Sequence, residues 1–424
     1  MRERKGMVWA ATLAALGAFA PCEASAAPPI IGGQDAPDGN QNVMQITTIS
    51  DRITCNGSLI APNLLLTARH CLVQSDISFD CDPTKPNGGN TFDVGAAIAA
   101  DKVRIFKSDQ AVLQPLGLAP TAVGRALFAD NTITLCGHDV AILLLDQDVP
   151  GAVRKPLRLS KSSRVGEPAY ALGWGAESIF GGRPPNLQRL DVSILALGPA
   201  NYQMIEGLPL VTTVERELVV GQSACTGDSG SPLVAAETGA IIGVASYVTN
   251  VYPERSNPPY VNPVTGIYPW CGEGSAAIYQ TLENRPFIAQ AFAASGHRAW
   301  LEGKPEPTLA FGEACTADEL CDTGPCVAGV CAKPCDAGTC PEGYACLNVG
   351  GQSVCGPPPS SGPSGAAGAV SAGGEAGAPV VVPNPSAANT NDGCAASGRA
   401  QPAGEVAVVL GLLAVTGARR RRRR

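Results

Sequence analysis

The longest part of the sequence, residues 30–300, is a succession of short β-prone runs that are cut by Gly, Pro, Asn and Asp. The clearest runs are residues 44–50, 58–66, 141–145, 169–173, 211–220 and 240–247. Many short strands in succession are typical of barrels and sandwiches. Helical periodicity is convincing only near the end of this part, where Pro286 precedes an apolar stretch. We therefore expect a large all-β domain that closes with one C-terminal helix.

Residues 1–26 have the features of an export signal. Three basic residues come first, residues 6–20 are almost wholly apolar, and residues 24–26 are small enough for a signal peptidase. A membrane anchor is the weaker alternative, because this run is short for about 30 Å of hydrocarbon. Cys22 could suggest lipid attachment, but Pro21 stands where such signals have a small flexible residue. We expect cleavage at this site and export.

The sixteen cysteines of an exported chain are expected to form disulfides, because no reducing buffer acts on them after export. Eight of them crowd between Cys315 and Cys355, in a region with too few aliphatic residues for a core of its own. A metal site is the alternative there, but no His stands among these cysteines. We expect a disulfide-bonded module over residues 312–356, whose pairing the sequence leaves open and whose partner is unknown.

Charge and composition limit the remaining possibilities. Only 16% of the residues are charged, and the net charge is −7 even though residues 419–424 are all arginines. This balance excludes a broad basic face that would bind nucleic acid. Residues 357–390 are mostly Gly, Pro, Ser and Ala with one charge and no aromatic residue, which predicts a disordered linker. No pattern indicates a cofactor or a metal.

The segment Gly227-Asp228-Ser229-Gly230 carries the strongest chemical signal. Glycines beside a serine allow a tight turn and bring main-chain N–H groups close to a reacting carbonyl, as an oxyanion hole requires. The serine also needs a base, and the base needs an acid that holds its tautomer. Of the three histidines, His70 ends an apolar run and His138 precedes Asp139, whereas His297 stands in a polar context and is expected on the solvated surface.

The chain order His70, Asp139, Ser229 and the sequence motifs around these residues resemble those of the trypsin/chymotrypsin family of serine endopeptidases. The resemblance covers about residues 30–300, within an expected domain of residues 30–303. It rests on five motifs in the family's order: Ile30-Ile31-Gly32-Gly33, Thr67-Ala68-Arg69-His70-Cys71, His138-Asp139-Val140-Ala141, Gly173-Trp174-Gly175 and Cys225-Thr226-Gly227-Asp228-Ser229-Gly230. It implies two antiparallel six-stranded β-barrels with the catalytic residues in the cleft between them. The substrates would be proteins or peptides.

On this resemblance Ser229 attacks the peptide carbonyl, His70 moves the proton and Asp139 orients the imidazole. The N–H groups of Gly227 and Ser229 form the oxyanion hole. The resemblance also implies an ion pair between Asp228 and a free amine at Ile30. Family members are usually cut after Arg or Lys to release that amine, but here Ala27-Pro28-Pro29 precedes Ile30, so the activating cut differs or the extra residues are accommodated.

The resemblance also places the specificity pocket. Ser223 corresponds to its base, where members that cleave after Arg or Lys carry an acid, and a buried cation without such a partner would be costly. We therefore expect cleavage after uncharged, small or apolar residues. The walls would be residues 246–248, namely Ser246, Tyr247 and Val248, together with Ala277, although the 22 residues between Val248 and Cys271 are an insertion that could reshape the pocket.

Three disulfides are expected in this domain. The resemblance pairs Cys55 with Cys71 and Cys225 with Cys271, and Cys81 with Cys136 is what then remains.

The C-terminal residues 391–424 resemble the tripartite MYXO-CTERM-type sorting signals of exported bacterial proteins. They contain Cys394, the apolar residues 406–418 and the six arginines, which would stay on the cytoplasmic side. This resemblance implies anchoring at the cell surface or outer membrane. The whole chain is thus expected to be an exported serine endopeptidase, and the alternative is a protease-shaped adhesion or scaffold protein without turnover.

Overall fold

The computed structural model describes residues 33–36, 42–48, 54–74, 81, 94–107, 119–175, 186–225, 227–250, 271, 274–335 and 340–358. All of these residues belong to one compact unit, Met1–Ser360. The expected export signal, Ile30, nearly all of the linker and the C-terminal sorting segment lie outside the described residues. Within the described residues, no helix is long and apolar enough to cross a membrane.

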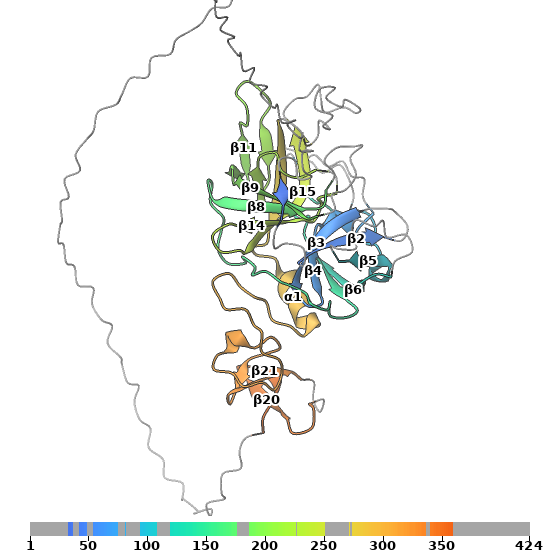
Figure 1. Ribbon diagram of the computed structural model, residues 1–424, viewed down its shortest axis with the longest axis vertical. Helices are drawn as coiled ribbons and strands as arrows, with labels where there is room; N and C mark the ends of the chain where they lie inside the picture. Colours follow the sequence, from blue (N-terminus) through green and yellow to red (C-terminus); the bar gives the residue numbers. More distant parts are fainter. Residues whose placement is uncertain are drawn as a thin grey trace, which may run out of the picture. The chain divides into compact units, whose positions relative to one another are not determined.

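Six strands form a closed barrel in the order β2-β3-β4-β7-β6-β5 (Figure 1). All pairs within it are antiparallel, and the strand β7 is buried along its whole length because its five residues are apolar. Short 3-10 turns lie at Arg69–Cys71 and Ala100–Lys102. The strands are β2 (Val43–Thr48), β3 (Thr54–Ala61), β4 (Leu64–Thr67), β5 (Val103–Phe106), β6 (Ala122–Ala129) and β7 (Ala141–Leu145).

Eight further strands form one sheet in the order β1-β9-β8-β14-β15-β16-β13-β10. The expectation of a second six-stranded barrel is not confirmed, since this sheet has eight strands and only the first set is closed among the described residues. The strands are β1 (Gln34–Asp35), β8 (Pro168–Gly173), β9 (Gln188–Ser193), β10 (Ala196–Leu197), β13 (Glu217–Val220), β14 (Pro232–Ala235), β15 (Ile241–Asn250) and β16 (Ser275–Thr281). A separate hairpin pairs β11 (Ala200–Tyr202) with β12 (Val211–Thr213).

The α-helix α1 (Pro286–Ser295) follows the last strand of the sheet. Proline at its first turn costs no hydrogen bond, because that N–H has no partner in a helix, and Gly296 ends the helix in the left-handed conformation. Phe287, Ile288 and Ala291 bury the apolar side of the helix in the same core as the strands of the barrel.

Residues 312–356 form small sheets that disulfides hold together. A 3-10 turn at Asp318–Leu320 precedes them, β17 (Cys326–Val327) pairs with β18 (Val330–Cys331), and β21 (Gln352–Gly356) lies between β19 (Lys333–Pro334) and β20 (Ala345–Val349). Because few side chains are buried here, the bridges replace a hydrophobic core. The pairs are Cys315–Cys326, Cys321–Cys331, Cys335–Cys346 and Cys340–Cys355.

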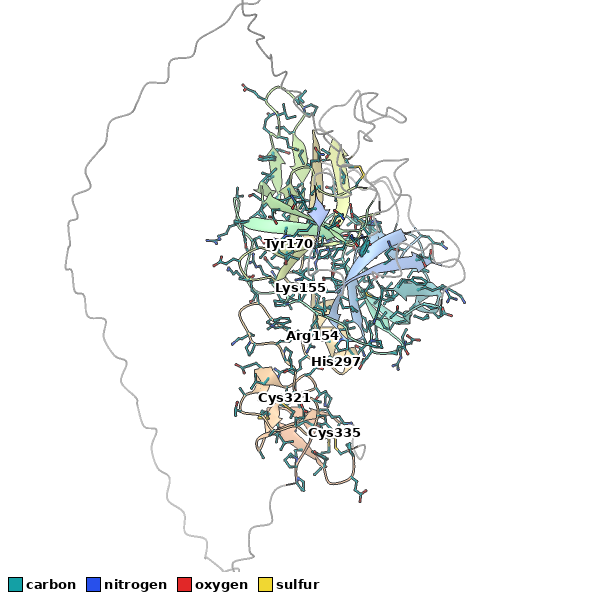
Figure 2. All side chains as sticks on the ribbon, viewed as in Figure 1. Arg154, Lys155, Tyr170, His297, Cys321 and Cys335 are labelled. Atoms are coloured by element: carbon teal, nitrogen blue, oxygen red, sulfur yellow. A yellow bond between two sulfur atoms is a disulfide. The ribbon has the colours of Figure 1, made fainter. Side chains whose placement is uncertain are left out.

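Polar contacts of Arg154 and His297, which are labelled in Figure 2, join this module to the preceding domain. Arg154 donates to Asp322 over 2.7 Å and to Glu306 over 3.0 Å, and His297 lies 2.6 Å from Asp322 through Nδ1. The expectation of a solvated His297 is wrong, because its side chain is only 14% exposed. Hydrogen bonding to Asp322 raises the pKa of His297 despite its burial, so the imidazolium and this carboxylate stabilise each other.

Candidate active site

His70 and Asp139 form a buried pair. Nδ1 of His70 lies 2.7 Å from Oδ2 of Asp139, and the main-chain N–H of His70 donates to Oδ1 of the same carboxylate over 2.7 Å. The two residues are only 5% and 0% exposed, so water does not compete for these contacts. A neutral imidazole that donates through Nδ1 carries its lone pair on Nε2. The pair is therefore arranged so that Nε2 can accept a proton.

The register of the barrel explains why residues so far apart in the sequence meet. Strands β4 and β7 pair antiparallel, with Thr67 opposite Ala141, so the end of one strand coincides with the start of the other. His70 follows β4 in a short 3-10 turn, and Asp139 lies two residues before β7. A disulfide between Cys55 on β3 and Cys71 fixes the turn from its other side. Its sulfur atoms are thus not thiolates that could bind a metal.

Two residues of the eight-stranded sheet complete the surroundings of Asp139. The hydroxyl of Ser246 on β15 donates to Oδ2 over 2.5 Å, and the main-chain N–H of Asp139 donates to Oε1 of Gln280 on β16 over 2.9 Å. The first bond fixes the position of the carboxylate, and the second fixes the main chain that carries it. The sheet therefore helps to hold the Asp139 carboxylate in place next to the imidazole.

The segment that carries Ser229 packs against the barrel. The carbonyl of Ser229 accepts the N–H of Asn56 on β3 over 2.7 Å. Gly230 has φ +82°, and a Cβ atom there would collide with Thr67 and with the Asn56 carbonyl. Only glycine therefore allows this approach. The contact brings residue 230 against the end of β4, three residues before His70.

Asp228 anchors the same segment to the eight-stranded sheet. Its carboxylate accepts the N–H of Gly175 over 2.7 Å and that of Cys225 over 2.9 Å, and the residue is 1% exposed. A Cβ atom at Gly173 or Gly175 would collide with this carboxylate, which gives the Gly-Trp-Gly motif a packing reason. The expected partner of Asp228, the amine of Ile30, lies outside the described residues.

The expected pocket residues lie on neighbouring elements of the sheet. Val248 on β15 stands directly opposite Ala277 on β16, and Ala277 in turn faces Val220 on β13. Ser223 follows β13, is fully buried and donates to the carbonyl of Gly221 over 3.2 Å. The buried Tyr279 also bonds Ser223, and burial together with the charge of Asp228 raises the pKa of that phenol. The Tyr279 phenol that bonds Ser223 is therefore neutral.

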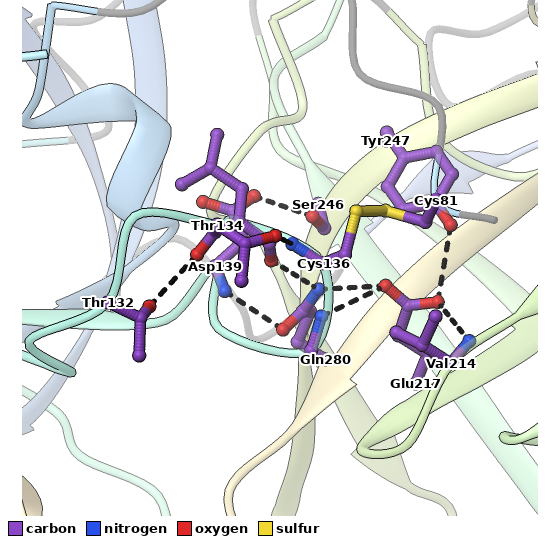
Figure 3. Close-up of a disulfide and its surroundings, with 12 residues drawn as sticks. Cys81, Thr132, Thr134, Cys136, Asp139, Val214, Glu217, Ser246, Tyr247 and Gln280 are labelled. Atoms are coloured by element: carbon purple, nitrogen blue, oxygen red, sulfur yellow. Dashed lines mark hydrogen bonds between the residues drawn. A yellow bond between two sulfur atoms is a disulfide. The ribbon is translucent and has the colours of Figure 1, made fainter. Parts of the chain in front are cut away.

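A buried carboxylate, Glu217, lies beside Asp139 (Figure 3). It accepts hydrogen bonds from Nε2 of Gln280 over 3.1 Å, the hydroxyl of Tyr247 over 3.2 Å and the main-chain N–H groups of Gly137 over 3.3 Å and Val214 over 3.0 Å. Burial raises the pKa of Glu217 to about 7, although the N–H donors act in the opposite direction. Because Gln280 also accepts the N–H of Asp139, one amide side chain joins the two acids.

Sequence reasoning missed Glu217, Gln280 and Asn56. The only available signals were an acid within the β-prone run 211–220 and two amide residues in runs that are otherwise small or apolar. His138 takes no part in the hydrogen bonds of the site described above. Its Nδ1 lies 2.8 Å from Oδ2 of Asp130. The cysteines of the domain form the disulfides Cys81–Cys136 and Cys225–Cys271 in addition to the one beside His70.

Comparison with known proteins fits this arrangement. Residues 30–271, more than half of the chain, match the family model named Trypsin, so the chain belongs to the trypsin family. It is 26% identical over 223 residues to chymotrypsin-2 of Vespa crabro, an alignment that covers 51% of this chain and 88% of that protein. It is also 26% identical over 223 residues to trypsin of Saccharopolyspora erythraea, with 51% and 86% covered. Family membership supports peptide hydrolysis as a serine endopeptidase, and protein or peptide substrates.

Proposed function

We propose that this protein hydrolyses peptide bonds through an acyl-enzyme on Ser229. His70 takes the proton of the serine hydroxyl through Nε2 and returns it to the leaving amine, while Asp139 holds the imidazole and stabilises its cation. The N–H groups of Gly227 and Ser229 bind the oxyanion. No metal or cofactor is needed for these steps.

The observation that carries this proposal is the buried contact between His70 and Asp139. The 2.7 Å distance leaves Nε2 as the basic atom, and a third group, Ser246, fixes the carboxylate. The packing of Gly230 against the end of β4 supports the same assignment, because it brings the serine segment to the strand that leads into His70. A structural ion pair would not require a Gly-Asp-Ser-Gly segment at this point.

A fluorophosphonate probe, which reacts covalently with activated serines, tests the assignment. We expect the wild-type protein to be labelled and the Ser229→Ala variant to be unlabelled, with kcat on a peptide substrate lower by about 10⁶-fold. Ser162→Ala is the matched control, because Ser162 is exposed and bonds only Glu283 among the described residues. Its labelling should equal that of the wild type. Equal labelling of Ser229→Ala would refute the proposed nucleophile.

A non-catalytic adhesion or scaffold protein is the second candidate. It is favoured by one observation, the absence of Arg or Lys directly before Ile30, because an untrimmed end could leave the site silent. The probe separates the two candidates when it is applied to protein that begins at Ile30. Labelling of that form supports the enzyme, and no labelling supports the scaffold.

The substrate residue before the cleaved bond is proposed to be uncharged and small or apolar. Ser223 supplies a neutral hydroxyl at the base of the pocket, and Val248 faces Ala277 across the strands that form its wall. A peptide library should therefore show cleavage after Ala, Val or Leu rather than after Arg or Lys. The Val248→Gly variant should shift the preference towards larger side chains, and strong cleavage after Arg by the wild type would contradict this assignment.

We also propose a division of the chain into domains and processed ends. Residues 30–303 are the protease domain, with the eight-stranded sheet as the counterpart of the second barrel, and residues 312–356 are an accessory module. The seven disulfides among the described residues are consistent with an oxidising compartment, so we propose export after cleavage of residues 1–26. Residues 391–424 would then serve as a sorting and anchoring signal. Mass spectrometry of the ends of protein isolated from cells tests both processing steps.

A further inference from the structure

Asn56 on strand β3 holds the segment of residues 227–231 at three points. Its main-chain N–H donates to the carbonyl of Ser229 over 2.7 Å. Its side-chain Nδ2 donates to the carbonyl of Gly227 over 3.0 Å and to the hydroxyl of Ser231 over 2.9 Å. One residue of the barrel thus contacts every second residue of the segment that carries the proposed nucleophile.

The burial of the Asn56 amide indicates that its N–H groups contribute to stability. Asn56 is fully buried, and its carbonyl oxygen Oδ1 has no hydrogen-bond partner among the described residues. A buried polar atom without a partner costs stability, so an amide side chain here is unfavourable unless its donors compensate. Both donors of Nδ2 are used, and both end on residues 227–231.

Asn56 also connects this segment to the histidine. Its main-chain carbonyl accepts the hydroxyl of Thr67 over 2.7 Å, at the end of the strand that leads to His70. Its neighbour Cys55 is bonded to Cys71, the residue after His70. A shift of Asn56 would therefore move the serine segment relative to the imidazole.

From these contacts we infer that Asn56 is a positioning residue that fastens the nucleophile segment to the barrel and makes its order largely independent of a free amine at Ile30. The inference rests on the proposed function. The resemblance assigns the ordering of this segment to an ion pair that Asp228 makes with that amine. The bonds from Asn56 reach both residues that flank Asp228 and start from the barrel, so none of them involves the amine of Ile30.

The kinetic test compares the wild type with Asn56→Ala in the full chain. Loss of two buried hydrogen bonds should lower kcat by about tenfold to a hundredfold while KM changes by less than about threefold, because the loss affects the oxyanion site rather than the pocket. A peptide boronic acid, which occupies the oxyanion site, should bind correspondingly more weakly. The matched control is Asn63→Ala, which removes a single amide bond to Ser295 at the far end of the same hairpin and should leave kcat unchanged.

Two further variants show whether Asn56 acts through the assigned bonds. Ser231→Ala removes one acceptor, and its effect on kcat should add less than fully to that of Asn56→Ala, because both variants break the same bond. Asn56→Asp keeps the shape but replaces the donors by a carboxylate that faces two oxygens, and it should lose at least as much kcat as Asn56→Ala. Full additivity, or an Asn56→Asp variant with wild-type kcat, would overturn the inference.

The dependence on the N-terminus gives a readout that a purely structural role would not change. Proteins that begin at Ala27 and at Ile30 should have kcat/KM values within about threefold of each other in the wild type. In Asn56→Ala, the form that begins at Ile30 should be about tenfold or more active than the form that begins at Ala27, because the amine then has to order the segment. An inactive wild-type form that begins at Ala27 would refute independence from the amine.

Hydrogen exchange separates this inference from the proposed function. Asn56→Ala should increase amide exchange in the peptide 227–235, and Asn63→Ala should not. If the wild type hydrolyses no peptide and Ser229 reacts with no probe, the proposed function fails, but the exchange result still decides whether Asn56 holds the segment. Unchanged exchange in that peptide, together with unchanged kcat, would refute the positioning role.

Discussion

Replacing Glu217 by Gln tests the electrostatics beside the site. The carboxyl group is buried, and burial raises its pKa from an ordinary value of 4.5 to about 7. An acid whose pKa is higher in the folded protein keeps its proton there while the unfolded chain releases it. The folded state thus binds more protons between pH 4.5 and 7, and the free energy of unfolding must fall as the pH rises through this range.

The size of the effect follows from the pKa difference. A rise of about 2.5 pH units at about 1.4 kcal/mol per unit corresponds to about 3 to 4 kcal/mol of stability that is lost once the pH is well above 7. The amide of the Glu217→Gln variant cannot ionise, so the variant should lack this loss. That amide would also face two former donors, which lowers the stability of the variant by a similar amount at every pH. Only the dependence on pH therefore reports the titration.

The assay is urea unfolding of both proteins at several pH values between 4 and 8. The stability of the wild type minus that of Glu217→Gln should fall by about 3 kcal/mol across this range, because other titrating groups cancel in the difference. Glu215→Gln is the control, since Glu215 is an exposed acid on the turn that precedes β13, and its difference should vary by less than about 0.5 kcal/mol. A flat or rising difference for Glu217→Gln would refute the reasoning, since it would mean that the four donors hold Glu217 ionised throughout.

Three other substitutions probe separate parts of the structure. Ser246→Ala removes a 2.5 Å bond to the Asp139 carboxylate and should lower kcat by roughly tenfold, with unchanged kcat speaking against a role for this bond. Gly230→Ala should abolish folded protein, as judged by soluble yield and thermal unfolding, because its Cβ would collide with the barrel; Gly239→Ala, also at positive φ but with open space around it, should still fold. Arg154→Ala should weaken the attachment of the cysteine-rich module to the protease domain by about 3 kcal/mol. In a Ser229→Ala protein, an added protease should then cleave residues 304–311 faster, and an unchanged rate would contradict a role of Arg154 in this attachment.

The candidate site could be read from the sequence only as far as its motifs reach. His70, Asp139 and Ser229 stand in short sequence motifs whose residue types follow from the chemistry, so each could be named without coordinates. Asn56, Glu217 and Gln280 stand in no such motif. Their importance depends on distant partners: Gln280 lies 63 residues from Glu217 and 141 from Asp139, and Ser231 lies 175 from Asn56. No local pattern encodes such distances.

The fold shows the same division. Alternation of short apolar runs with Gly and Pro indicated an all-β domain, and the closed barrel of six strands agrees with that expectation. The same runs did not specify how the second set of strands pairs, and it forms an eight-stranded sheet. Strand pairing is a choice among distant partners of similar composition, so it depends on the whole core rather than on any one run.

By itself the sequence determined the chemistry that is available: a serine between glycines, a histidine beside a cysteine, an acid before a buried strand, and a set of cysteines suited to an oxidising compartment. Only the tertiary structure decided which of these groups meet. The register of β4 with β7 brings His70 to Asp139, and the missing side chain of Gly230 lets the serine segment reach the barrel. Burial also raises the pKa of Glu217, because the cost of ionisation depends on the neighbours that folding supplies.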